Sequence, residues 1–162
     1  MSDRIVKSTV LKAPHDRVWR AISDTKQFGT WFGVDIAGSF TPGARLACKI
    51  TATKVDPEIA KSQEPYSGTP FEIVVDKVEP MRVLSFHWHP YGVEAGDLSK
   101  EPMTLVEFAL DEVSGGTKLT ITESGFDKIP LERRAKAFAA NEGGWTAQLE
   151  LIAKFLAGGY AA

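Results

Sequence analysis

Residues 82–89 constrain the fold of this chain more than any other segment. They read Arg-Val-Leu-Ser-Phe-His-Trp-His, so large apolar side chains alternate with polar ones, as in a β-strand with one apolar face. Residues 130–157 carry apolar side chains three, four and seven residues apart, which predicts a long helix with one apolar stripe. The stripe consists of Phe138, Trp145, Leu149, Ile152 and Leu156. Together the two patterns predict a sheet wrapped around a helix, which encloses either a packed core or a ligand cavity.

The remaining elements predict an α+β fold. A first strand near 4–12 precedes two short helices, one near Pro14–Ser23 and one that Asp24 caps and that ends near residue 33. Six strands follow, near 34–40, 45–55, 71–79, 82–89, 103–111 and 117–124, and then the long helix.

The connections between the predicted strands differ in length. Short turns alternate with two long polar loops, 56–70 and 90–102. In an antiparallel meander, both long loops and the link 124–130 lie at one end of the sheet, which is where a binding mouth is expected. The alternative is that the long loops are tolerated insertions without a function.

Composition narrows the class of protein. A chain of 162 residues with 43% hydrophobic and 25% charged residues predicts one globular domain, 1–162. The net charge of −2 and the absence of a basic run disfavour a nucleic-acid partner. No apolar stretch approaches about 18 residues, so no membrane span is predicted. The first residues lack an apolar signal region, and we expect a cytoplasmic protein.

The residues predicted to line a cavity lie on the inward faces of the strands and helices. They are Trp31, Leu46, Cys48, Ile50, Phe71, Ile73, Val75, Leu84, Phe86, Trp88, Val106, Phe108, Leu119, Ile121, Phe138, Trp145 and Leu149. Glu123 continues the inward alternation of 117–123, which makes it a candidate polar contact for a ligand. Alternatively, Glu123 lies in water at the rim or accepts structural hydrogen bonds. Glu142 near the helix stripe is either its acid–base partner or a solvated side chain.

Three further features each allow more than one interpretation. Cys48 is the single cysteine, and it is either a buried inert thiol or, with a base nearby, a nucleophile. His87 and His89 share one strand face, as a metal pair would, but no third ligand is fixed, so neither a metal nor a cofactor is expected. Gly143 and Gly144 cost about 2 kcal/mol inside a helix. They indicate close packing, a kink or room for a ligand.

Short motifs distributed along the chain resemble those of START-like (SRPBCC) proteins. The motifs are Ala13-Pro14 with Val18-Trp19, Trp31, Pro42-Gly43, Val78-Glu79-Pro80, 84–88, 116–120, 123–126 and Gly144-Trp145. In this order they resemble the branch named for the activator of the heat-shock chaperone ATPase, over nearly the whole chain. The resemblance implies a helix-grip fold, in which a curved antiparallel sheet grips the C-terminal helix around a hydrophobic cavity.

The resemblance also suggests what such a protein does. The first hypothesis is binding of a small hydrophobic or amphipathic ligand, which is lipid-, steroid- or polyketide-like, by a monomer or homodimer without catalysis. The second is a cyclase- or hydrolase-like enzyme that uses Glu123. The third is a stress-related module that contacts a chaperone.

Overall fold

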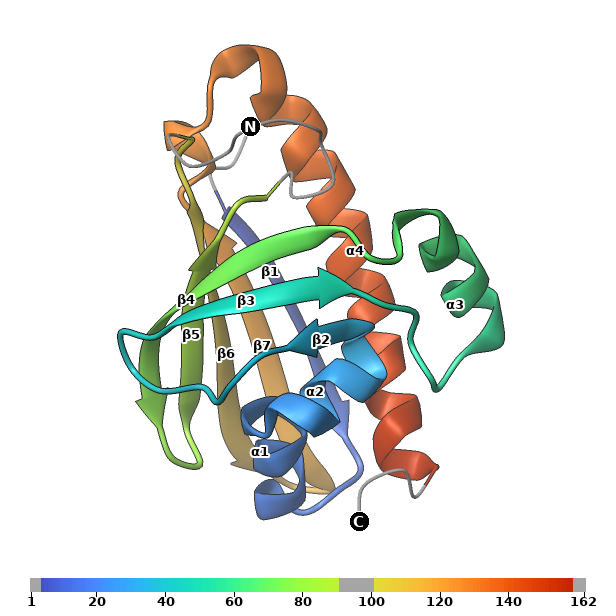
Figure 1. The fold of residues 1–162 in the computed structure, drawn as a ribbon. Coiled ribbons are helices and arrows are strands. Elements are labelled where there is room, and N and C mark those ends of the chain that lie inside the picture. Colours follow the sequence, from blue (N-terminus) through green and yellow to red (C-terminus); the bar gives the residue numbers. More distant parts are fainter. Residues whose placement is uncertain (1–3, 91–100, 159–162) are drawn as a thin grey trace.

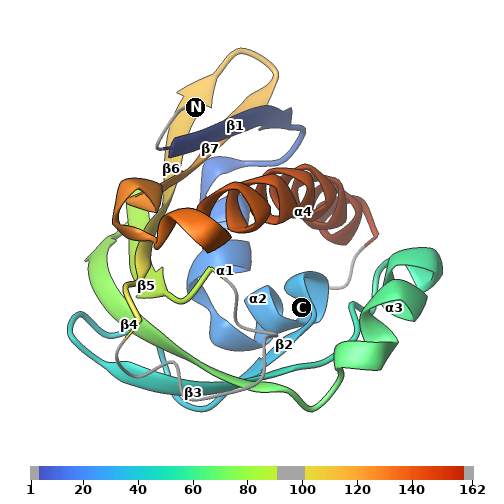
Figure 2. The same cartoon turned by 90° about the horizontal axis from the view of Figure 1, so that it is seen from above.

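Seven antiparallel strands form one sheet that curves around the last helix (Figures 1 and 2). This computed structural model describes residues 4–90 and 101–158. The strands are β1 (Arg4–Leu11), β2 (Val34–Ile36), β3 (Arg45–Ile50), β4 (Pro70–Glu79), β5 (Val83–Trp88), β6 (Thr104–Val113) and β7 (Gly116–Ser124). Their order in the sheet is β1-β7-β6-β5-β4-β3-β2, a meander to which β1 is added beside β7. The predicted α+β helix-grip fold is therefore confirmed.

The helices are α1 (His15–Ser23), α2 (Thr25–Phe32), α3 (Pro57–Gln63) and α4 (Leu131–Ala157), with short 3-10 turns η1 (Glu64–Tyr66) and η2 (Phe126–Lys128). Helices α1, α2 and α4 pack against the concave face of the sheet, whereas α3 lies to one side of it. Figure 2 shows α4 inside the curve with α2 beside it. As predicted, Asp24 caps α2 by accepting hydrogen bonds from the backbone N–H groups of Lys26 and Gln27.

The core lies between the concave face and the helices α1, α2 and α4. Most of the predicted inward-facing strand residues are buried in it: Leu46, Cys48, Ile73, Val75, Leu84, Phe86, Val106, Phe108, Leu119 and Ile121. The helices contribute large side chains that are also buried, among them Phe28, Trp31, Trp145 and Phe155. The period-two pattern of the strands thus identifies one wall of the core.

An irregularity in β4 bends the sheet. The register between β4 and β5 shifts between Val75 and Lys77, which places Asp76 in a bulge. The Ser85 hydroxyl accepts from the Lys77 N–H at 3.2 Å and donates to the Asp76 carboxylate at 2.9 Å. A bulge increases the local twist of a strand, and this one lies where the sheet turns around α4.

Two predicted strands are shorter than expected. The strand predicted at 34–40 ends at Ile36, because Gly38 takes a φ of 108° and the chain leaves the ladder. The strand predicted at 45–55 ends at Ile50, after which the Thr51 N–H donates to the Gly33 carbonyl instead.

Part of the predicted loop 56–70 is helical. It contains α3 and η1, and Asp56 caps α3 through the N–H groups of Glu58 and Ile59 at 2.9 and 3.1 Å. Asp56 followed by Pro57 is the usual signal for a helix start, so the sequence contained the evidence for α3. Most of the second predicted loop, 90–102, lies outside the described residues.

One ion pair connects α3 to α4. The Lys154 ammonium of α4 contacts the Asp56 carboxylate, and its hydrogen bond is the main cause that lowers the pKa of Asp56. No residue of α3 is fully buried, so this ion pair, the hydrogen bonds of Gln63 to Thr53 and Phe32, and the packing of Ile59 against the core are what connect it to the sheet and the other helices.

The helices in the described part of the chain do not include a candidate membrane span. None of them is both long enough and apolar enough to cross a bilayer.

Candidate functional site

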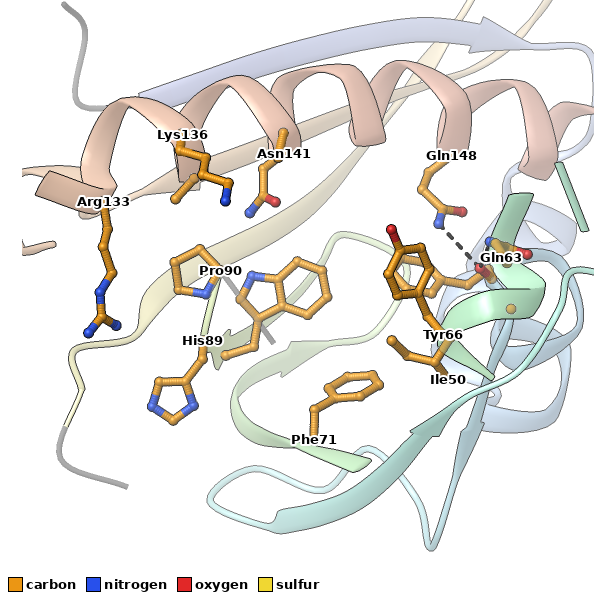
Figure 3. Close-up of a pocket in the computed structure, with 15 residues that line it drawn as sticks. Ile50, Gln63, Tyr66, Phe71, His89, Pro90, Arg133, Lys136, Asn141 and Gln148 are labelled. Atoms are coloured by element: carbon orange, nitrogen blue, oxygen red, sulfur yellow. Dashed lines mark hydrogen bonds between the residues drawn. The ribbon is translucent and has the colours of Figure 1, made fainter. Parts of the chain in front are cut away.

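A cavity of about 490 Å³ opens between the sheet and α4, at the end of the sheet where the long connections lie (Figure 3). This volume is within the usual range of small-molecule sites. Its apolar wall consists of Phe32, Ile50, Phe71, Trp88, Pro90, Ala137 and Ala140. Its polar lining consists of Gln63, Tyr66, His89, Arg133, Lys136, Asn141 and Gln148, together with the backbone of Gly33. A mostly apolar cavity with a few polar groups is typical of a ligand site.

Trp88 is the central ring of the apolar wall. Its indole stacks on Trp145 of α4, with ring centroids 5.5 Å apart and planes inclined by 26°. Phe32 and Phe71 meet the same indole edge-on, at 6.1 and 6.3 Å. Trp88 therefore joins β5, α2, β4 and α4 around the cavity.

Glu123 of β7 is fully buried behind this wall, with 0% exposure. Its Oε1 accepts from Trp145 Nε1 at 2.8 Å and from Asn141 Nδ2 at 2.9 Å. Its Oε2 accepts from Trp88 Nε1 at 2.9 Å and from the Thr104 hydroxyl at 2.5 Å. All four residues that form these hydrogen bonds are donors. This suits a carboxylate, because both of its oxygens only accept hydrogen bonds.

This arrangement selects among the interpretations of Glu123. The carboxylate is not part of the cavity lining, so it does not face a ligand directly. It fixes the indole of Trp88 and the amide of Asn141, and both of these do line the cavity. Glu123 therefore positions residues of the cavity wall. Of the interpretations given above, the one in which it accepts structural hydrogen bonds agrees with its contacts.

The other predicted cavity residues divide into two groups. Ile50, Phe71 and Trp88 line the cavity, and Trp145 lines an adjoining hollow of about 80 Å³. The remaining members are packed in the core or against it: Trp31, Leu46, Cys48, Ile73, Val75, Leu84, Phe86, Val106, Phe108, Leu119, Ile121, Phe138 and Leu149. The concave face is thus largely solid, and the cavity occupies only its open end.

Sequence reasoning missed the polar residues that α4 contributes. Asn141 and Gln148 lie seven residues apart, on the face of the helix that borders the cavity. Glu142, one candidate acid–base partner of Glu123, is exposed, and the neighbouring Asn141 contacts Glu123 instead. The rotation of the helix decides which of two adjacent polar residues points inward. That rotation was readable only approximately from the apolar stripe.

Close packing does not explain the glycine pair of α4. A Cβ atom added at Gly143 or Gly144 would meet no other atom within 4 Å. Gly144 borders the adjoining hollow, so a kink and open space beside the cavity remain as the two interpretations.

The inner end of the cavity is built around the carbonyl oxygen of Phe32. It accepts hydrogen bonds from Gln63 Nε2 at 3.3 Å and from Gln148 Nε2 at 3.2 Å. Gly33 ends α2 with a φ of 90°, and a Cβ there would lie 2.9 Å from the Gln63 amide. The left-handed conformation at this position therefore favours glycine, whereas the flexible end of the Gln63 side chain could shift to make room. This cluster holds α2, α3 and α4 together beside the cavity.

The histidines do not form a metal site with other residues that the structure describes. His89 Nε2 lies 3.0 Å from the Glu101 carbonyl oxygen, and its ring borders the cavity. Within 4–90 and 101–158, no group of three or more potential ligands is arranged to hold a metal ion.

Cys48 is expected to be unreactive in the native protein. Its side chain is 3% exposed, and desolvation, followed by the nearby carboxylates of Asp35 and Glu72, raises the pKa of the thiol to about 12. Only the thiolate is nucleophilic, so alkylation by iodoacetamide at pH 8 should be at least roughly 100-fold slower than in the denatured chain. Mass spectrometry of timed samples, with and without guanidinium, measures this ratio. Similar rates in both states would contradict the assignment of Cys48 as an inert thiol.

The chain matches the model of one protein family, and its fold is similar to that of several solved structures. A family model described as Activator of Hsp90 ATPase homolog 1-like protein matches residues 12–157. A search of curated proteins finds no match.

Solved structures share the fold over nearly the whole chain. DynU16, a protein in the dynemicin biosynthetic locus, is 25% identical with a TM-score of 0.67, and the match covers 96% of this chain and 48% of DynU16. This chain thus spans about half the length of DynU16. MLL2253 from Mesorhizobium loti is 21% identical with a TM-score of 0.71, covering 96% and 98%. The Aha1 dimer from Colwellia psychrerythraea is 18% identical with a TM-score of 0.67, covering 96% of each chain.

Proposed function

The chain belongs to the family of Activator of Hsp90 ATPase homolog 1-like proteins, and from this premise we propose that it binds a small, largely apolar molecule beside Trp88. The observation that carries the proposal is the cavity of about 490 Å³, whose exposed surface is mostly apolar although seven polar side chains also line it. The proposed ligand is hydrophobic or amphipathic, and the proposed setting is the cytoplasm.

A prearranged wall supports binding. Glu123 fixes Trp88 and Asn141 through hydrogen bonds, and Phe32 and Phe71 pack edge-on against the indole. Side chains that are already ordered lose little entropy when a ligand binds. The same contacts therefore give a higher affinity than they would with mobile side chains. The cavity is also long, because Arg133 and Gln148 both line it and a helix rises about 22 Å over that interval. An elongated ligand fits this shape better than a compact one.

The alternative of an enzyme that uses Glu123 has less support. Among the described residues, no aspartate or glutamate lines the cavity. An acid or base must come within hydrogen-bond reach of the reacting group, and Glu123 is separated from the cavity by the residues it holds. Binding is therefore the function that the geometry supports best.

A substitution that fills the cavity tests the proposal. Ala140 lines the cavity and is itself exposed, so Ala140→Phe should reduce the space without disturbing the core. We expect wild type to bind the neutral probe 1-pyrenebutanol with one site, and Ala140→Phe to bind it at least about tenfold more weakly. Energy transfer from tryptophan to pyrene reports the binding.

The neighbouring residue provides a matched control. Ala139 is also exposed on α4 but does not line the cavity, so Ala139→Phe should bind the probe like wild type. Equal affinities of wild type and Ala140→Phe would place the probe elsewhere. Absence of binding by wild type, up to the solubility of the probe, would contradict the proposed function.

A further inference from the structure

The charged residues of the cavity lie at one of its ends. Two cationic side chains, Arg133 and Lys136, belong to the lining. Within the described ranges no acidic side chain belongs to it. The chain as a whole carries a net charge of −2, so the positive charge of the cavity lining is opposite in sign to the charge of the whole chain.

Both cations project from the same face of the first turns of α4. They are three residues apart, and the lining residues Ala137 and Ala140 continue the same face. Figure 3 shows both side chains at the end of the cavity marked by His89 and Pro90, away from Gln63 and Gln148. The cavity therefore has a cationic end and an end built from amides.

The two cations differ in their surroundings. Arg133 forms an ion pair with Glu101 at 3.1 Å, and its side chain remains 37% exposed. A guanidinium carries five N–H donors, so it can contact a second carboxylate while it keeps the first. Lys136 is exposed, and the described residues give it no ion pair. Of the two cations, Lys136 is thus the one without an ion pair to any residue in 4–90 and 101–158.

From this arrangement we propose that the ligand is an anionic amphipath, whose charged group lies at Lys136 and Arg133 while its apolar body lies against Trp88. This inference rests on the proposed function and specifies the class of ligand. A carboxylate, sulfonate or phosphate at the end of an apolar body has this chemistry. The same charge would steer such a molecule toward the cavity and orient it along α4.

Two probes with the same apolar body test the inference. 1-Pyrenebutanoic acid is anionic at pH 7.5, whereas 1-pyrenebutanol is neutral and otherwise similar in shape. We expect wild type to bind the acid about fivefold more tightly at low salt, and this preference to shrink at about 0.5 M salt because exposed charges are screened.

Variants of Lys136 locate the charged group. Lys136→Gln should remove about half or more of the preference for the acid over the alcohol, and Lys136→Glu should abolish or reverse this preference. Lys118→Gln makes the same change in net charge on an exposed β7 residue at the opposite end of the sheet. It should leave the preference intact.

The outcomes separate this inference from the proposed function. If wild type binds the acid and the alcohol equally, the inference is overturned and the proposed function stands. A preference that both Lys136 variants retain would also overturn it, because the charged group would then lie elsewhere. If neither probe binds, the proposed function fails and the inference fails with it.

Discussion

Glu123→Gln is expected to lower the free energy of unfolding by about 3 kcal/mol, although the side chain keeps its size. The carboxylate accepts hydrogen bonds from Trp88, Thr104, Asn141 and Trp145. An amide keeps one acceptor oxygen and replaces the other by a donor NH₂ group. Whichever way it turns, the NH₂ group faces the indole N–H of either Trp88 or Trp145. A buried donor without an acceptor costs about 1–3 kcal/mol, and the weakened bonds to the other partners add to this cost.

Urea unfolding followed by circular dichroism measures this effect. Glu112→Gln is the control, since Glu112 is exposed on β6 and its substitution should change stability by less than about 0.5 kcal/mol. The tryptophan emission of native Glu123→Gln should also change. Trp88 and Trp145 stack on each other, and the indole N–H of one of them loses its hydrogen-bond acceptor. Equal stability of Glu123→Gln and wild type would show that the carboxylate does not hold the wall.

Phe108→Ala is expected to cost about 4 kcal/mol, the largest effect of any single substitution considered for this protein. The ring has 0% exposure. Its ring centroid lies 5.8 Å from that of Phe28 of α2, 6.1 Å from that of Phe86 of β5 and 5.8 Å from that of Trp145 of α4. Its removal therefore leaves a hole where two helices meet the sheet, and the rigid surroundings cannot close it fully.

The urea midpoint, with an unchanged slope of the transition, measures the loss of stability. Phe108→Leu fills most of the space and should cost clearly less than Phe108→Ala. Val10→Thr on the solvent side of β1, where Val10 is 50% exposed, should be close to neutral. A cost below about 1 kcal/mol for Phe108→Ala would contradict the packing described here.

The sheet was readable from the sequence because burial on one face produces a local pattern. Leu84 and Phe86 alternate with polar residues, and both are fully buried as the alternation predicts. The antiparallel order followed from short turns between neighbouring strands, and the registers of β4, β5 and β6 agree with it. The end of the sheet that carries the cavity could be inferred in the same way, from the lengths of the connections.

The details of the site could not be read, because they depend on contacts between distant elements. The donors to Glu123 come from β5, β6 and α4, so no segment of sequence shows that the carboxylate is satisfied. Inward alternation also did not distinguish Ile73, which is packed in the core, from Phe71, which borders the cavity. That difference depends on how closely α2 and α4 approach each part of the sheet.

The pairing of β1 with β7 has a consequence for the synthesis of this protein. Leu11 lies opposite Thr117, so β1 obtains its only partner in the described sheet from near the other end of the chain. Closing a loop of roughly 100 residues costs about 4 kcal/mol of chain entropy before the pairing can repay it. At about 5–20 residues per second, the ribosome needs about 5 to 20 s to make that interval. β1 therefore stays without its partner strand until β7 has been synthesised, and the sheet can be completed only from then on.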